Sequence, residues 1–127
     1  MIAVDTSALM AIVLGEPGAE ACMAALEVEA QVLISGGTLA EALIVAGRRG
    51  VSDEMERLVA GLAMQVAPTD AASARRCAEA YRRWGKGAHP ASLNCGDCFA
   101  YELAKTNGCA LLFVGDAFAQ TDLQRAG

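Results

Sequence analysis

Apolar residues along the chain fall into two patterns. Three runs are almost continuously apolar and end at acidic residues or glycines, namely Ile2–Val4, Gln31–Ser35 and Cys109–Val114. A shorter run of the same kind spans Gln65–Ala67. Short continuous apolar runs bounded by turn residues are typical of strands that are buried on both faces. The pattern therefore predicts three buried strands and a short fourth one.

The stretches between these runs carry apolar residues at helical spacing. The predicted helices span Thr6–Leu14, Ala19–Glu29, Thr38–Arg49, Asp53–Met64, Asp70–Trp84 and Asp97–Thr106. Buried strands that alternate with helices predict a parallel sheet with helices on both faces. The expected fold class is therefore α/β, with three layers (α/β/α) and a central parallel sheet of four to five strands.

Length and composition limit the organisation of the protein. The 127 residues fit one compact domain, residues 1–127. Hydrophobic residues make up 54% of the chain, so we expect part of this apolar surplus to be covered by self-association. No basic and apolar leader precedes the first strand, and no apolar run reaches the ~18 residues of a membrane span. We therefore expect a cytoplasmic protein without a membrane segment.

Charge argues against a protein that holds nucleic acid on a broad basic face. The chain has 10 Lys and Arg against 15 Asp and Glu, a net charge of −5. Any nucleic-acid function then needs metal ions or a local basic segment. The one local basic cluster is Arg82–His89, which the glycines within it predict to be a loop. Its Trp84 and His89 are more often packing residues than nucleic-acid contacts.

Histidine and cysteine restrict the chemistry further. His89 is the only histidine, which excludes mechanisms and metal sites that need two imidazoles and disfavours a thiol or serine triad. Cys95 and Cys98 have the spacing of a zinc half-site or a redox pair, but the chain has no second such pair. We therefore favour small buried hydrophobic residues as the role of the five cysteines.

Four acidic residues stand in apolar surroundings, unlike the acids on the polar helix faces. Asp5 and Asp116 each follow a predicted strand, and Glu41 and Asp97 lie near predicted helix starts. In an open parallel sheet, ligands bind beyond the carboxyl ends of the strands. Each acid alone is equally well explained as a helix cap or a surface charge. Four converging carboxylates repel one another, however, and therefore indicate a bound metal, Mg²⁺ or Mn²⁺ by the preference of all-oxygen sites.

Four segments carry a resemblance to a known family: Met1–Leu9, Ala40–Leu43, Gly85–Ala104 and Leu111–Leu123. In order and content they resemble the PIN-domain toxins of the VapC family, from one end of the chain to the other. The resemblance implies a PIN-like fold and an Mg²⁺-dependent endoribonuclease, the toxin of a type II toxin–antitoxin pair. It also implies a homodimer that binds a cognate, VapB-like antitoxin.

The resemblance assigns roles to particular residues. Asp5 and Asp97 match the principal metal ligands of the family, and Glu41 matches its third acid. The residues that match supporting hydrogen-bonding positions are Thr6, Ser7 and Asn94. An ion held by Asp5 and Asp97, with Glu41 and Asp116, would activate a water for attack on an RNA phosphodiester. The residues expected to steer RNA towards this crevice are Lys86, Arg82 and Arg83.

Two positions depart from the family pattern. Ala117 stands where the last motif usually has a second acid, and Ala88 stands in a loop where relatives often place Arg. Either Asp116 takes over the role of the missing acid or the site is impaired, and a deliberate inactivation would leave the same alanine. Two other functions therefore stay open. One is a PIN-fold binding module without catalysis, and the other is an Mg²⁺-dependent phosphotransfer domain, which would need a Lys after a late strand, although no Lys follows Lys105.

Overall fold

A four-stranded parallel sheet forms the centre of the molecule, in a computed structural model that describes residues 1–127. Its strands are β1 (Ile2–Val4), β2 (Val32–Ser35), β3 (Gln65–Ala67) and β4 (Ala110–Leu112). They lie in the order β3-β2-β1-β4, with Ile2 opposite both Val32 and Ala110. The predicted α/β class and the parallel sheet are confirmed. The last predicted strand is shorter than expected, because only Ala110–Leu112 pairs with β1.

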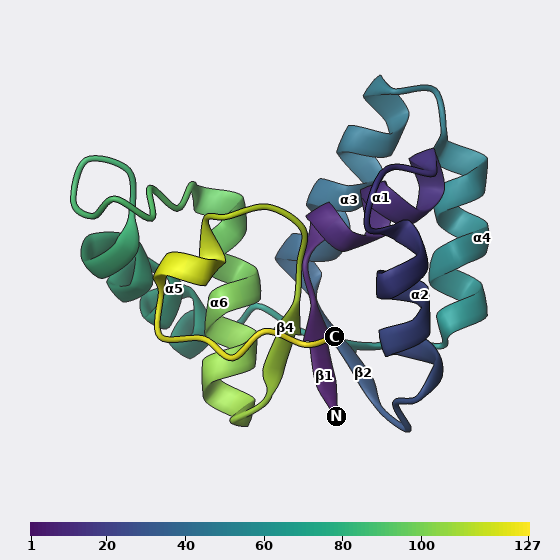
Figure 1. Cartoon of the computed structure of the whole chain (residues 1–127). Helices are drawn as coiled ribbons and strands as arrows, with labels where there is room; N and C mark the ends of the chain where they lie inside the picture. The colour runs from purple at the N-terminus through teal and green to yellow at the C-terminus, as the bar shows by residue number, and fades with distance from the viewer.

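Helices cover both faces of this sheet (Figure 1). The helices are α1 (Thr6–Leu14), α2 (Ala19–Glu27), α3 (Gly36–Arg48), α4 (Ser52–Leu62), α5 (Ala71–Trp84) and α6 (Cys95–Asn107), followed by the 3₁₀ helix η1 (Phe118–Gln120). In Figure 1, α1 to α4 lie on one side of the strands and α5 and α6 on the other. The three-layer architecture is therefore confirmed.

Side-chain alternation along the strands divides the core in two. Ala3, Leu33 and Leu111 pack with α5 and α6, whereas Val4 and Ile34 pack with α1 to α4. Successive strand residues point to opposite faces of a sheet, so each buried strand supplies both layers. This explains why the strands read as continuous apolar runs rather than as alternating ones.

Two helices begin earlier than their apolar spacing predicts. Helix α3 begins at Gly36, because the hydroxyl of Ser35 accepts a hydrogen bond from the Gly37 amide and caps it. Helix α6 begins at Cys95, because Asn94 caps it in the same way. Helix α5 continues to Trp84, so Arg82 and Arg83 lie on its last turn rather than in a loop. The predicted basic loop is therefore confined to the residues after Trp84.

The C-terminal segment closes one edge of the sheet. The Leu111 amide donates to the Gln124 carbonyl, and the Ala126 amide donates to the Leu111 carbonyl. This pairing covers the free edge of β4, while β3 remains the other edge. No single helix has the length and hydropathy needed to cross a membrane. Only α1 and α2 taken together reach them, with a bend of 115° between the two helices.

Candidate active site

Asp5 stands at the carboxyl end of β1 and caps α1. Its Oδ2 accepts hydrogen bonds from the Ser7 amide at 3.0 Å and from the Ser7 hydroxyl at 2.6 Å. The residue is only 3% exposed, and its Oδ1 is buried without a hydrogen-bond partner. A buried carboxylate oxygen that accepts nothing is unusual, because buried polar atoms are normally paired. This oxygen is therefore free to bind a ligand.

The residues beside Asp5 tie the ends of three elements together. The Ser7 hydroxyl that donates to Asp5 also accepts a hydrogen bond from the Val114 amide at 3.0 Å. The Thr6 hydroxyl donates to the Thr38 carbonyl at 3.3 Å, which joins α1 to α3. Ser7 thus links the Asp5 carboxylate to the segment after β4, and Thr6 links α1 to α3. Ser7 contacts the Asp5 carboxylate directly, whereas the Thr6 hydroxyl contacts only the Thr38 carbonyl, and the supporting role of both stays a prediction.

Asp97 lies in the first turn of α6, in a reciprocal cap with Asn94. The Asp97 amide donates to Asn94 Oδ1 at 2.8 Å, and Asp97 Oδ2 accepts from the Asn94 amide at 2.9 Å. Because one carboxylate oxygen is bound in this way, the orientation of the side chain is fixed. Asn94 therefore holds the Asp97 side chain in one orientation.

Glu41 reaches the same place from α3. Its carboxylate lies against the backbone of Gly96, where an added Cβ would come within 2.1 Å of Oε2. Gly96 thus provides the space that the Glu41 side chain occupies. In the sequence, the only sign of a role for Gly96 is its place in the first turn of α6, between Cys95 and Asp97.

Electrostatics shows that the three acids form one group. Burial raises the pKa of Asp5 to about 6, the hydrogen bonds from Ser7 oppose this change, and the charges of Asp97 and Glu41 add to it. Burial also raises the pKa of Asp97, against the hydrogen bond from Asn94 and with the help of the Glu41 charge. A carboxylate whose pKa is raised by neighbouring carboxylates lies in a place that is short of positive charge. No cation of the chain compensates the Asp5 carboxylate.

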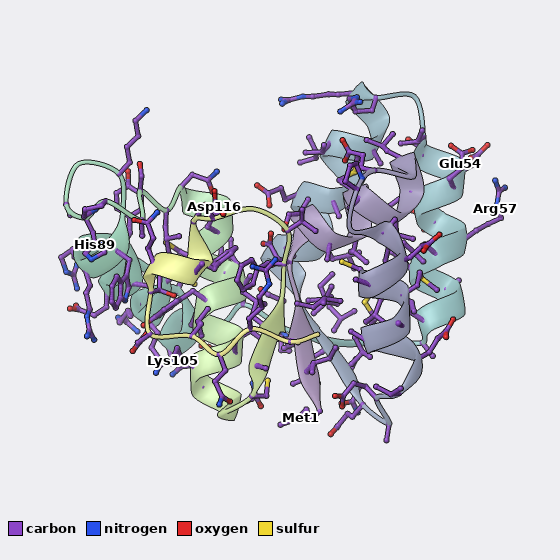
Figure 2. All side chains as sticks on the ribbon, viewed as in Figure 1. Met1, Glu54, Arg57, His89, Lys105 and Asp116 are labelled. Carbon is purple, nitrogen blue, oxygen red and sulfur yellow. The ribbon has the colours of Figure 1, made fainter.

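Asp116 is not part of this group. It lies exposed on the loop after β4 (Figure 2), and it shares no hydrogen-bond partner with Asp5 or Asp97. The loop leaves the sheet through Gly115, whose φ of 104° favours glycine. Ala117 is half-buried and packs against the core beneath α5 and α6. The structure therefore brings together Asp5, Glu41 and Asp97 but not the fourth predicted acid.

The basic residues near α5 have different surroundings. Arg82 forms an ion pair with Glu79, and the guanidinium of Arg83 lies 4.7 Å from the centre of the Trp84 ring. Lys86 is exposed in the loop after α5 and forms no ion pair. Of the three, only Lys86 has a cationic group without a partner in the chain.

Trp84 and His89 are packing residues. The Trp84 indole donates to the Tyr101 hydroxyl at 2.9 Å, and this hydroxyl donates to Asp122 at 2.7 Å. The His89 ring packs edge-on against Trp84 at 4.7 Å, and its Nδ1 accepts from the Ala91 amide. Figure 2 shows His89 at the outer side of α5.

The cysteines form no disulfide, and three of them are buried. Cys95 is exposed, so the expectation of a buried hydrophobic role does not hold for that residue. No three or more His, Cys, Asp and Glu side chains are arranged closely enough to enclose a metal ion. The Cys95–Cys98 pair therefore has no third ligand that would complete a zinc site.

The acidic group nevertheless suits one kind of ion. Mg²⁺ keeps several of its waters and is usually bound by one or two carboxylates. Asp5 offers the buried Oδ1 that has no partner, and Asp97 and Glu41 lie beside it. Oxygen ligands without thiol or imidazole favour Mg²⁺ or Mn²⁺. The residues present therefore fit a hydrated divalent ion.

Comparison with known proteins shows which class of protein has this fold. A model of the PIN domain matches residues 2–123. The crystal structure of VapC20 from Mycobacterium tuberculosis, a toxin that cleaves the sarcin–ricin loop, matches with a TM-score of 0.81 at 15% identity and covers 100% of both chains. A chain of a toxin–antitoxin complex from Klebsiella pneumoniae matches with a TM-score of 0.71 at 18% identity, over 96% of this chain and 93% of that one. The protein is therefore a PIN-domain protein.

The sequences of related proteins show to which family of PIN-domain proteins this chain belongs. Ribonuclease VapC42 of Mycobacterium tuberculosis strain H37Rv is 42% identical over 127 residues, which cover 97% of each chain. The protein belongs to the VapC family of PIN-domain ribonucleases.

Proposed function

We propose that this protein is the endoribonuclease toxin of a type II toxin–antitoxin pair and cleaves RNA with Mg²⁺ or Mn²⁺. One observation carries the proposal: Asp5 presents a buried carboxylate oxygen without a partner beside Asp97 and Glu41. An acid at the carboxyl end of a parallel strand, joined by acids from two helices, is suited to a metal-dependent hydrolase. Relatives of this chain that share more than 40% of its residues carry the name ribonuclease.

Asp5 and Asp97 are the residues that would hold the ion. When bound, it lowers the pKa of a water ligand and stabilises the charge that develops on the phosphate. The Ser7 and Asn94 hydrogen bonds keep the two carboxylates in place, so little reorganisation accompanies the reaction. Glu41 is placed to accept a proton from the attacking water at its carboxylate. In-line attack would leave a 5′-phosphate and a 3′-hydroxyl.

The steering of RNA falls mainly to Lys86. It is the one predicted steering residue without a partner, because Arg82 is paired with Glu79 and Arg83 lies on Trp84. Its charge attracts phosphates towards a crevice that would otherwise repel them. We expect Arg82 and Arg83 to contribute less.

Cleavage of labelled RNA tests the proposal. Wild-type protein should cleave in Mg²⁺ and stop in EDTA, and Asp5→Asn or Asp97→Asn should lose at least about a hundredfold in rate, because each removes a metal ligand. Glu27→Gln is the matched control, since Glu27 is an exposed acid on α2. Calorimetry should show Mg²⁺ binding to the control and not to the two site variants. If RNA stays intact but an antitoxin peptide still binds, the non-catalytic module, which the alanine at position 117 also favours, replaces this proposal.

Partners follow from the apolar surface and the acidic crevice. A cavity of about 520 Å³ lies between α5 and α6, lined mainly by apolar side chains that include Tyr81 and Phe99. We propose that a second copy of the chain covers this face, and Tyr81→Glu should then convert a dimer into a monomer in light scattering.

A VapB-like antitoxin would bind at the acidic crevice through a basic segment. We place both proteins in the cytoplasm.

A further inference from the structure

Most basic side chains of the protein are engaged within the chain. Ion pairs or ring contacts occupy six of the ten, and these are Arg57 with Glu54, Arg76 with Glu102, Arg82 with Glu79, Lys105 with Asp122, Arg83 on Trp84 and Arg125 on Phe113. The four without such a contact are Arg48, Arg49, Arg75 and Lys86. In a chain with a net charge of −5, these four are the cations available to an anionic ligand.

Arg48 stands out among them by its place on α3. It follows Glu41 by seven residues, which is two helical turns, so both lie on the same face of the helix about 10 Å apart along its axis. The face that carries Glu41 is the one that meets Gly96 at the start of α6. Arg48 therefore lies beyond the acidic group on this face of α3, which forms a wall beside the acids.

The stretch of α3 between these two residues is open to solvent. Ile44, one turn beyond Glu41, is 57% exposed, and Val45 beside it is only half-buried. Figure 1 shows α3 rising from the end of β2 past the point where β1 ends. Ile44 and Arg48 are both exposed on this wall, which leaves room for an extended strand from the acids to Arg48.

The acidic group at one end of the wall and Arg48 at the other indicate the chemistry of a ligand that would lie along it. At Asp5 and Asp97 a phosphodiester would bind through the ion, and further along the wall the next charged group is a guanidinium. A guanidinium binds phosphate oxygens in a bidentate manner and stays charged at every relevant pH. An RNA strand carries phosphates on both sides of the scissile one. We propose that Arg48 binds a backbone phosphate of the RNA next to the scissile phosphate, an inference that depends on the proposed function.

Arg49 supplies a control for a simpler explanation. A cation in the last turn of a helix also interacts favourably with the helix dipole, which applies to Arg48 and to the neighbouring Arg49 alike. Arg49 is turned by about 100° around the axis and so leaves the Glu41 face. Arg57 is a second control, because Figure 2 shows it on the outer side of α4, away from the strands.

RNA binding is measured by fluorescence anisotropy in Mg²⁺, with a short labelled single-stranded RNA of mixed sequence and a Glu41→Gln protein, which lacks the proposed proton acceptor but keeps both metal ligands. Arg48→Ala should weaken binding about tenfold and lower the slope of log K against log salt by about one, as expected for one lost phosphate contact. Arg49→Ala and Arg57→Ala remove the same charge and should change binding by less than about twofold. In the cleaving protein, the loss for Arg48→Ala should fall on KM rather than kcat, and Arg48→Lys should restore part of it.

The outcomes separate this inference from the proposed function. Equal losses for Arg48→Ala, Arg49→Ala and Arg57→Ala would mean a general charge effect and would overturn the assignment. Unchanged RNA binding together with weaker antitoxin binding would assign Arg48 to the protein partner and would also overturn it. If the wild-type protein cleaves RNA in Mg²⁺ while Arg48→Ala binds and cleaves normally, only the inference about Arg48 fails.

Discussion

The carboxylate of Glu41 lies directly against Gly96, so that a Cβ at position 96 would come within 2.1 Å of Oε2 and 2.6 Å of Cδ. Two residues that are far apart in the chain thus share one small space, one on α3 and the other in the first turn of α6. The contact holds Glu41 beside Asp97, whose pKa its charge raises. The glycine is therefore part of the site although it has no side chain.

Gly96→Ala should lower the rate of RNA cleavage without lowering the thermal stability of the protein. The methyl group meets the end of a flexible side chain, so Glu41 can rotate away, and alanine is favoured over glycine in a helix by up to about 1 kcal/mol. We expect an unchanged or higher Tm and RNA cleavage reduced at least tenfold, because Glu41 leaves its place. Gly61→Ala is the matched control, since a Cβ at position 61 of α4 meets nothing within 4 Å. A variant that cleaves like the wild type would show that the position of Glu41 does not matter.

Stability of the metal-free protein should fall as the pH rises from about 4 to about 6. Asp5 has a pKa of about 6 in the folded protein against 3.8 as the unperturbed value, so the folded state holds its proton more tightly than the unfolded state. The resulting stability is present below pH 4 and is lost as the pH passes 6. The difference corresponds to about 3 kcal/mol.

The charge-free variant Asp5→Asn tests this pH dependence in urea unfolding. The variant should be more stable than the wild type at pH 7 by up to about 3 kcal/mol, and equal to it below pH 4. Adding Mg²⁺ at pH 7 should stabilise the wild type and not the variant. Asp53→Asn, an exposed acid in the first turn of α4, serves as the control. A wild type whose stability is constant between pH 4 and pH 6 would contradict the burial of a charged Asp5.

The sheet and two of the acids, Asp5 and Asp97, could be predicted from the sequence, because each is marked by the residues next to it in the chain. The continuous apolar runs show burial on both faces, and Asp5 and Asp97 stand out as charges in apolar surroundings. The predicted start of α3 at Thr38 was wrong, because the sequence from Ser35 to Gly37 is typical of a turn, whereas the helix begins at Gly36. The ring of Phe99 lies 2.6 Å from where a Cβ of residue 37 would be, so a glycine is needed inside the helix.

The remaining features of the site depend on contacts between residues that are far apart in the sequence. Asp5 directly follows β1, whereas Asp116 lies four residues beyond the end of β4 and is exposed. The contact of Glu41 with Gly96 and the bond from Val114 to Ser7 join residues distant in sequence. No local spacing encodes such contacts, so a single sequence cannot reveal them.

Ser7→Ala should destabilise the protein by about 1–3 kcal/mol, because it leaves the Val114 amide without its acceptor and removes a donor from Asp5. With one hydrogen bond fewer to the carboxylate, the pKa of Asp5 should rise further. The pH at which stability is lost should therefore move upwards in urea unfolding. Ser52→Ala, an exposed serine whose side chain makes no hydrogen bond, should change neither quantity. An unchanged pH profile would show that Ser7 does not stabilise the Asp5 charge.

Ala117→Asp tests whether this position lacks an acid that the site can use. Residue 117 is half-buried, precedes η1 and follows Asp116 directly. Because residue 117 packs against the core and Asp116 before it lies outside the acidic group, we expect Mg²⁺ binding in calorimetry and the rate of RNA cleavage to stay as in the wild type. Without metal the variant should be less stable than the wild type, because a charge replaces an apolar side chain that packs against the core.

Ala119→Asp is the control for Ala117→Asp, since residue 119 is exposed on η1 and the same charge there lies at the surface. Cleavage and bacterial growth arrest are compared for the two variants and the wild type, with EDTA as the metal-free reference. Faster cleavage in Ala117→Asp alone would mean that the alanine weakens the natural site. Equal cleavage in all three would mean that the site works without an acid at position 117, since Asp5, Asp97 and Glu41 already suffice. Cleavage by none of them would contradict the ribonuclease assignment and leave a PIN fold that only binds.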